Sequence, residues 1–264
     1  MNSRFAERID ESSVYPWYDS KWLTRYTQAV DIIRRLKPGA EAEFVAAFAP
    51  LRTDPSFEAT RLERPFDDAT LAEIKTTVAS FHPTALEFHE AKMHGRFIVH
   101  DHPYFAALQE PMEPLISEAV GEEVESLYNF VSLYTAKGVC GIHMDSPQSK
   151  WTFDFCVDQS GPWPLYLSQV VDWPEGEDPW VEGWQEQIKR SPDVRFTSHT
   201  LEPGQAVLFS GSSQWHYRDP MPASDRPAFC NLLFLHFVPK GTAGLLYYKN
   251  WAERFGVPEL ATVE

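Results

Sequence analysis

The sequence predicts a mainly β fold with helices, in which short strands form a barrel or jelly roll behind an N-terminal helical part. Three observations predict it. Helical spacing of apolar residues dominates before residue 125, short strand-like segments separated by Gly and Pro follow it, and 43% of the 264 residues are apolar against 23% charged. That balance is typical of a globular protein, and a chain of this length buries a substantial core without disulfides or metals.

We expect one domain over residues 1–264, made of three parts. Residues 1–125 form a mostly helical part, residues 126–240 form the jelly-roll core, and residues 241–264 form a C-terminal extension. A single domain of this length is common among all-β barrels and sandwiches.

Four helices are expected in the first part, each marked by apolar residues at helical spacing. Residues 37–39 (Lys-Pro-Gly) end the first, because Pro cannot continue a helix and Gly relieves its end. Asp67 or Asp68 can cap the third, and Pro111 and Pro114 interrupt the fourth. The expected ranges are 21–36, 40–48, 67–81 and 103–120.

Six strands are expected after residue 125, each a short segment that is apolar, aromatic or β-branched. The expected ranges are 126–134, 151–157, 163–171, 195–200, 205–210 and 227–238. Between two of them lies an acidic, Trp-rich insertion over residues 172–193. A long insertion of this kind is either a lid beside a site or a packed surface excursion.

Charge and cysteine content exclude several classes of protein. With 38 acidic and 23 basic residues the net charge is −15, which disfavours a general nucleic-acid binder. Apolar windows fall short of the roughly 18 residues that a membrane span needs, and the N-terminus does not read as a signal peptide. Cys140, Cys156 and Cys230 form no CxxC pair, so we expect free thiols in a reducing, cytoplasmic setting.

The strongest chemical signal is the motif His143-Met144-Asp145. Residues two apart on an extended chain face the same side, so the imidazole and the carboxylate can point at one metal ion. A later histidine would complete a face of two histidines and one carboxylate. Such a face leaves adjacent positions on Fe(II) open for a bidentate cosubstrate and for dioxygen. A motif this short also occurs by chance, so its context matters.

The context is provided by the segment LEPGQAVLFSGSSQWH, in which a Pro-Gly turn, an apolar strand and a small-residue loop lead to His216. Arg226 follows ten residues later. A guanidinium presents a rigid fork to a carboxylate, so Arg226 suits the far end of a dicarboxylic acid. Arg218 is the alternative anchor, with Asp219 as its possible salt-bridge partner. We favour Arg226 because it shares a face with alternate residues of the last strand, whereas Arg218 is expected in the preceding loop.

With His143, Asp145, His216 and Arg226 in this order, residues 126–240 resemble the Fe(II)/2-oxoglutarate-dependent oxygenase superfamily. The resemblance implies a double-stranded β-helix (jelly-roll) core plus an N-terminal helical layer. It also implies a dioxygenase that uses Fe(II), 2-oxoglutarate and O2 to hydroxylate, or otherwise oxidise at a C–H bond, a small-molecule metabolite or natural product. His143, Asp145 and His216 would be the metal ligands, and Arg226 would bind the distal carboxylate of 2-oxoglutarate.

Two further points follow from the resemblance. Some members carry a cosubstrate-binding tyrosine at the place of Tyr134, with Ser132 a weaker candidate on the same face; a core aromatic is an equal interpretation of Tyr134. Halogenating relatives have a small residue at the place of Asp145, so hydroxylation is favoured. The carboxylate partner that the family usually offers near the last strand is not found in the sequence.

The remaining histidines and tryptophans have ordinary interpretations. His100-Asp101-His102 is expected in a turn or helix cap, within a region that reads as helix and turn, and His236 is expected as a hydrogen-bonded core residue. Tryptophans near the expected mouth of the site would favour an apolar or ring-bearing substrate; they are Trp163, Trp173, Trp180, Trp184 and Trp215.

Two other functions stay open. A cupin-like metal enzyme could use the same histidines without 2-oxoglutarate, although Arg226 argues against it. A non-catalytic jelly-roll binding protein could carry the His-x-Asp motif without using it. For the oxygenase we expect a small-molecule substrate, with no nucleic acid and no membrane as partner.

Overall fold

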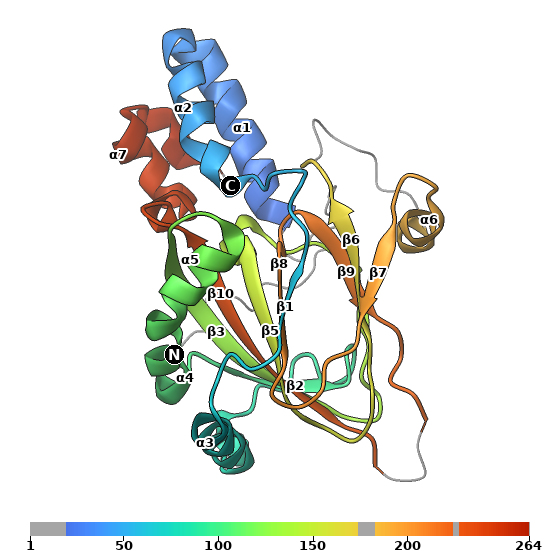
Figure 1. Cartoon of the computed structure of the whole chain (residues 1–264). Helices are drawn as coiled ribbons and strands as arrows, with labels where there is room; N and C mark the ends of the chain where they lie inside the picture. The colour runs from blue at the N-terminus through green and yellow to red at the C-terminus, as the bar shows by residue number, and fades with distance from the viewer. Residues whose placement is uncertain (1–19, 174–182, 224–226, 264) are drawn as a thin grey trace.

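The computed structural model describes residues 20–173, 183–223 and 227–263, which form two antiparallel sheets with helices around them (Figure 1). The larger sheet has the strand order β1-β8-β5-β10-β3-β2 and the smaller one has the order β4-β9-β6-β7. The strands are β1 (Thr60–Leu62), β2 (Arg96–His100), β3 (Val124–Tyr134), β4 (Cys140–His143), β5 (Trp151–Gln159), β6 (Leu165–Val170), β7 (Phe196–His199), β8 (Ala206–Phe209), β9 (Gln214–Arg218) and β10 (Cys230–Pro239). Two sheets whose strands alternate along the chain in this way make the predicted jelly roll.

The helices lie around this core: three lie beside the larger sheet, two at the start of the chain pack with the C-terminal one, and one lies beside the smaller sheet (Figure 1). The four helices expected before residue 125 are present close to their ranges, whereas α6 and α7 had no expected range. Asp67 caps α3 by accepting a hydrogen bond from the Thr70 amide at 2.7 Å. The predicted interruption of the fourth helix is also present, because a 3-10 turn separates α4 from α5. The helices are α1 (Ser20–Leu36), α2 (Glu41–Phe48), α3 (Asp68–Ala79), α4 (Pro103–Gln109), α5 (Glu113–Val120), α6 (Trp184–Arg190) and α7 (Trp251–Phe255).

All six predicted strands are present among the described residues, but β1, β2, β4 and β9 were not predicted and the start of the last strand was misplaced. The stretch around His100 forms β2, which joins the edge of the larger sheet, and was expected as helix and turn. Residues 214–218 form β9, where a loop was expected. The last strand begins at Cys230 and not at residue 227. The N-terminal part therefore contributes strands to the barrel as well as a helical layer.

Alternation along the strands of the larger sheet separates two apolar clusters. Val131, Phe153 and Leu233 face outward and are covered by Ile74 of α3, Phe105 of α4 and Ile116 of α5. Their inward neighbours, among them Leu232, Cys156 and Phe209, meet Leu165 and Leu167 of the smaller sheet inside the barrel. All of these side chains except the two leucines of β6 belong to the larger sheet or its helices, so that sheet is buried on both faces.

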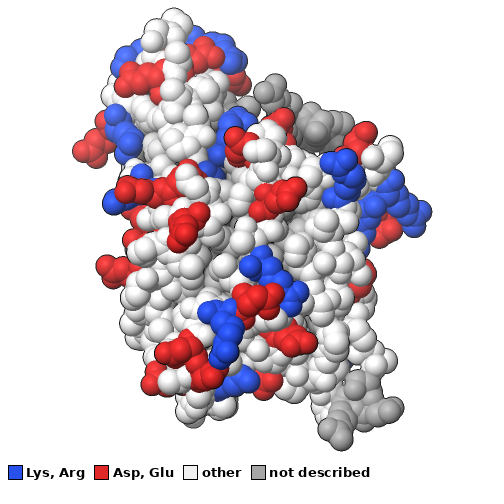
Figure 2. All heavy atoms as spheres, in the orientation of Figure 1, with Lys and Arg blue, Asp and Glu red and all other residues white. Residues whose placement is uncertain are grey.

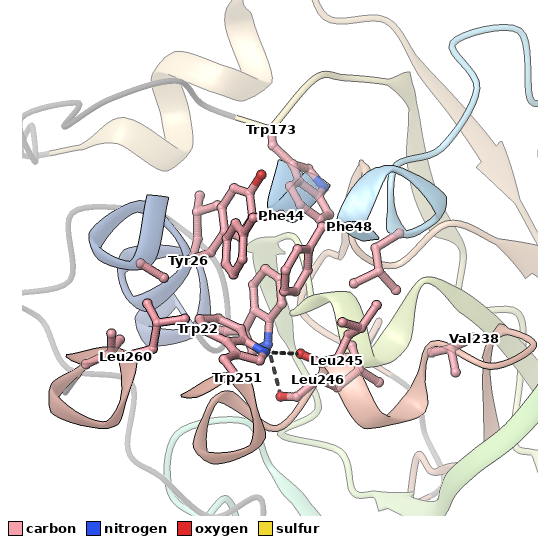
Figure 3. Packing of buried hydrophobic residues seen from close by; sticks show 14 of the residues in the cluster. Trp22, Tyr26, Phe44, Phe48, Trp173, Val238, Leu245, Leu246, Trp251 and Leu260 are labelled. Carbon is pink, nitrogen blue, oxygen red and sulfur yellow. Dashed lines mark hydrogen bonds between the residues drawn. The ribbon is translucent and has the colours of Figure 1, made fainter. Parts of the chain in front are cut away.

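A third cluster joins α1, α2 and the C-terminal segment (Figure 3). Trp22 lies at its centre, in edge-to-face contact with Phe48, Trp173 and Trp251. The Trp22 indole donates a hydrogen bond to the Leu246 carbonyl at 3.0 Å, and the Trp251 indole donates one to the Leu245 carbonyl at 2.7 Å. The C-terminal extension is thereby fixed to the first helix. Among the described residues, no helix is long and apolar enough to cross a membrane.

Candidate metal centre

The three predicted ligands come together between two strands of the smaller sheet. β4 and β9 are antiparallel neighbours in which His143 lies directly opposite His216. Asp145 follows β4 by two residues, and its Oδ1 is 3.4 Å from His143 Nε2 and 3.7 Å from His216 Nε2. One donor atom from each residue lies within 4.8 Å of the others, and this is a group that can hold a metal ion.

Backbone carbonyls fix the orientation of both imidazoles. His143 Nδ1 is 2.7 Å from the Gly141 carbonyl, and His216 Nδ1 is 2.9 Å from the Gln214 carbonyl. A carbonyl only accepts, so each Nδ1 must carry the hydrogen, and in the neutral ring each Nε2 presents a lone pair toward Asp145. Metal-binding histidines are oriented in this way by a hydrogen bond from the other ring nitrogen.

The protonation states suit a divalent cation. Burial raises the pKa of Asp145, but the nearby His216 and His143 outweigh this and bring the pKa to about 2, so the carboxylate is ionised at neutral pH. Burial and the neighbouring His143 lower the pKa of His216 to about 4, so its ring is neutral. Burial also lowers the pKa of His143, but Cys140 and Asp145 raise it more, to well above its ordinary value. A bound cation would take the place of that proton.

The donor set fits the group that the sequence implies. Two neutral nitrogens and one carboxylate oxygen on one side of the centre are the face that non-haem Fe(II) takes, with open positions on the other side. The open side faces a cavity of about 610 Å³, which all three ligands line.

Asp145 is held from behind by Gly211 in the loop between β8 and β9. The Asp145 amide donates to the Gly211 carbonyl at 2.8 Å. A Cβ at Gly211 would lie 2.6 Å from Asp145 Oδ2 and equally close to Ser149 O and Thr152 Oγ1. A side chain there would therefore displace the carboxylate.

We expect Gly211→Ala to lower the affinity for a divalent metal by about 10- to 100-fold, the usual cost of disturbing a ligand's support. Calorimetric titration with Ni(II) measures it. Gly161→Ala is the matched control, because nothing lies within 4 Å of a Cβ at Gly161. Equal affinity in both variants would contradict the proposed role of Gly211.

The cavity has one wall of charged residues from the larger sheet. Arg96 of β2 is paired with the buried Glu90, and its Nη1 donates to Tyr134 Oη at 2.8 Å and to Ser132 Oγ at 3.3 Å. Tyr134 is buried edge-on against Trp163 at 4.7 Å, and burial raises the pKa of its hydroxyl. Tyr134 and Arg96 line the cavity, and Ser132 lies beside them on β3, so the cosubstrate role of Tyr134 stays a prediction. Arg96 was not predicted, because in the sequence it is an isolated basic residue.

Arg218 is in a different place from the predicted one. It is the last residue of β9, two residues beyond His216, and not part of a loop. It is buried, and its Nη2 donates to Asp154 Oδ2 at 2.6 Å. Arg226 lies outside the described residues, and β10 begins four residues after it, so the shared-face argument that favoured it does not apply.

The prediction for the tryptophans needs correction, whereas His236 is buried and hydrogen-bonded as predicted. Trp163, Trp173, Trp184 and Trp215 do not line the cavity, Trp180 lies outside the described residues, and Trp22 of α1 is the tryptophan that does line it. His236 is buried as expected, with Nδ1 3.3 Å from Thr152 Oγ1, but it faces the cavity and its Nε2 has no partner among the described residues.

The cluster His100-Asp101-His102 is divided between a strand and a helix cap, and only the cap was predicted. His102 Nδ1 accepts from the Tyr104 amide at the start of α4, and Asp101 takes a positive φ of 46°. His100 ends β2 and contacts Glu87 at 2.8 Å. The insertion over 172–193 contains α6, while residues 174–182 lie outside the described part, so the choice between lid and surface excursion stays a prediction.

Comparison with known proteins gives likeness of structure only. No protein-family model matches the chain, and no curated protein matches its sequence. The chain is similar to the structure of EctD from S. alaskensis with 2-oxoglutarate and 5-hydroxyectoine, at 16% identity over 75% of this chain and 76% of that one, with a TM-score of 0.51. It is also similar to AviO1 from Streptomyces viridochromogenes Tue57, at 14% identity over 75% of this chain and 95% of that one, with a TM-score of 0.51. These likenesses establish the shared fold.

Proposed function

We propose that this chain is an Fe(II)- and 2-oxoglutarate-dependent dioxygenase that oxidises a C–H bond of a small molecule, with hydroxylation as the simplest outcome. The observation that carries the proposal is the metal centre: two imidazoles oriented by backbone carbonyls and an ionised carboxylate, all open to one cavity. EctD, which shares the fold, was solved with 2-oxoglutarate.

The residues of this chain would have distinct tasks. His143, Asp145 and His216 would hold the iron, and the carboxylate would offset part of its charge. Bound iron and 2-oxoglutarate would supply the oxidation, in which dioxygen is consumed and 2-oxoglutarate is converted to succinate and carbon dioxide. The walls of the cavity would hold the substrate's C–H bond near the open side of the metal and exclude water.

Two arginines are candidates for the anchor of the distal carboxylate. The sequence favours Arg226, and Arg218 is the alternative. Arg218 lies two residues from His216 on the same face of β9, which supports it, but its guanidinium already binds Asp154 and the Trp163 carbonyl.

The test is an anaerobic titration of the metal-free protein with Fe(II) and then with 2-oxoglutarate, followed by the weak visible charge-transfer band. We expect the band in the wild type, and a weaker band in whichever of Arg226→Gln and Arg218→Lys removes the anchor. Iron binding without a band would favour the cupin-like metal enzyme. Failure to bind Fe(II) at all would favour the non-catalytic binding protein, and either result overturns the proposal.

A further inference from the structure

One end of the cavity is built by α1 and the C-terminal segment. In the sequence, α1 precedes all three metal ligands and the C-terminal segment follows them. Trp22 and Arg25 of α1 line it together with Tyr247, Tyr248 and Lys249. The indole hydrogen bond from Trp22 to the Leu246 carbonyl, drawn in Figure 3, ties the two segments together. This end, which we call the mouth, is therefore fixed before any ligand arrives.

Two cations surround one aromatic ring at the mouth. The Arg25 guanidinium lies 4.2 Å from the centre of the Tyr248 ring, and Lys249 Nζ lies 6.0 Å from the same centre. Among the described residues neither cation has a carboxylate within salt-bridge distance. The Nε of Arg25 is buried and has no hydrogen-bond partner there.

The other charged groups that line the cavity are already matched. Glu90 pairs with Arg96, Asp154 pairs with Arg218, and Asp145 belongs to the metal centre. A divalent cation and a dianionic cosubstrate would cancel each other, so they would leave Arg25 and Lys249 as they are. The chain has a net charge of −15, and its acidic and basic side chains are interspersed over the face shown in Figure 2. Two unmatched cations in one cavity are therefore unusual for this protein.

Arg25 is partly buried and unmatched, which is costly unless a ligand supplies the opposite charge, and the exposed Lys249 adds a second positive charge beside it. Guanidinium and ammonium groups in a concave site are the usual partners of carboxylate and phosphate groups. The rings of Trp22, Tyr247 and Tyr248 beside them suit an apolar or aromatic body.

We infer that the mouth binds the acidic group of the substrate through Arg25 and Lys249, so the substrate is an organic anion with an apolar or aromatic body. The inference rests on the proposed function and names the substrate class of the same site. The anionic group lies at the mouth, and the body extends inward toward the open side of the metal centre.

The test uses four probes that share a phenyl body: phenylacetate, phenyl phosphate, phenylacetamide and phenethylamine. Calorimetric titration into protein loaded with Ni(II) and 2-oxoglutarate should show at least one of the two anions binding about tenfold or more tighter than the neutral amide. The double variant Arg25→Gln/Lys249→Gln should lose that preference. Arg35→Gln, which changes an exposed cation on the same helix, should keep it.

The outcomes separate the sources of the charge and the two proposals. A preference for phenylacetate assigns a carboxylic acid, and a preference for phenyl phosphate assigns a phosphate ester. Equal or tighter binding of the amide or amine, no binding of either anion, or a preference that persists in the double variant overturns the inference. The same probe titration in metal-free protein should keep the anion preference. If the titration with Fe(II) and 2-oxoglutarate gave no charge-transfer band, the oxygenase proposal would fail and the anion-binding inference would stand.

Discussion

Asp145→Ala should lower the affinity for a divalent metal by at least about 100-fold and abolish 2-oxoglutarate turnover. Asp145 is the only carboxylate in the group of three described donors, and its pKa of about 2 keeps it charged at every pH at which the protein would be assayed. Removing it leaves two neutral imidazoles, which bind a hard divalent ion far less tightly. Removing a residue that only orients a metal ligand already lowers metal affinity by about 10- to 100-fold, so removing a ligand should cost at least as much.

Two measurements check this expectation. Calorimetric titration with Ni(II) gives the affinity, and thermal unfolding gives an independent readout, because metal at about 100 times its dissociation constant stabilises the folded state by roughly 2.7 kcal/mol. At the same metal concentration Asp145→Ala should gain almost none of that. Asp31→Ala, which removes an exposed carboxylate of α1, should behave as wild type. Unchanged metal binding in Asp145→Ala would place the cation elsewhere.

That the three candidate ligands lie together could be predicted from the sequence because their signal is local. His143 and Asp145 are two residues apart beside a strand, and His216 follows an apolar strand and a turn. The jelly roll was predictable for a similar reason, since the alternation of β3 and the long apolar run of β10 are both visible in the local sequence.

What could not be predicted depends on contacts between distant parts of the chain. β2 is five residues long beside a polar His-Asp-His cluster, so its strand character comes from pairing with β3. The side chains of His216 and Arg218 on β9 point inward. Because these buried residues are polar, β9 lacks the apolar alternation by which a strand is predicted from sequence. Arg25 and Lys249 are separated by more than two hundred residues, and only the packing of Trp22 on the C-terminal segment brings them to one mouth.

Arg218→Met should destabilise the protein by about 3–5 kcal/mol, because it leaves Asp154 as an uncompensated charge inside the barrel. Asp154 is 1% exposed and Arg218 is 4% exposed. Burial raises the pKa of Asp154 even with the guanidinium beside it, and one of its carboxylate oxygens has no hydrogen-bond partner among the described residues. Without Arg218, no cation among the described residues would pair with the Asp154 carboxylate. The free energy of unfolding would then fall by the cost of burying an unpaired anion or of protonating it.

Urea unfolding of a double-mutant cycle separates the pair from its parts. Arg218→Met/Asp154→Leu replaces both charges with apolar groups and should recover most of the stability lost in the single variant. The pH dependence has a definite sign: the pKa of the buried Asp154 carboxyl lies above its unfolded value, so acidification neutralises it and should narrow the deficit of Arg218→Met. Arg61→Met, which breaks an exposed pair with Glu63, should cost less than about 1 kcal/mol. If Arg218→Met cost no more than Arg61→Met, the buried pair would contribute nothing beyond a surface ion pair, and Asp154 would have to be neutral in the wild-type protein.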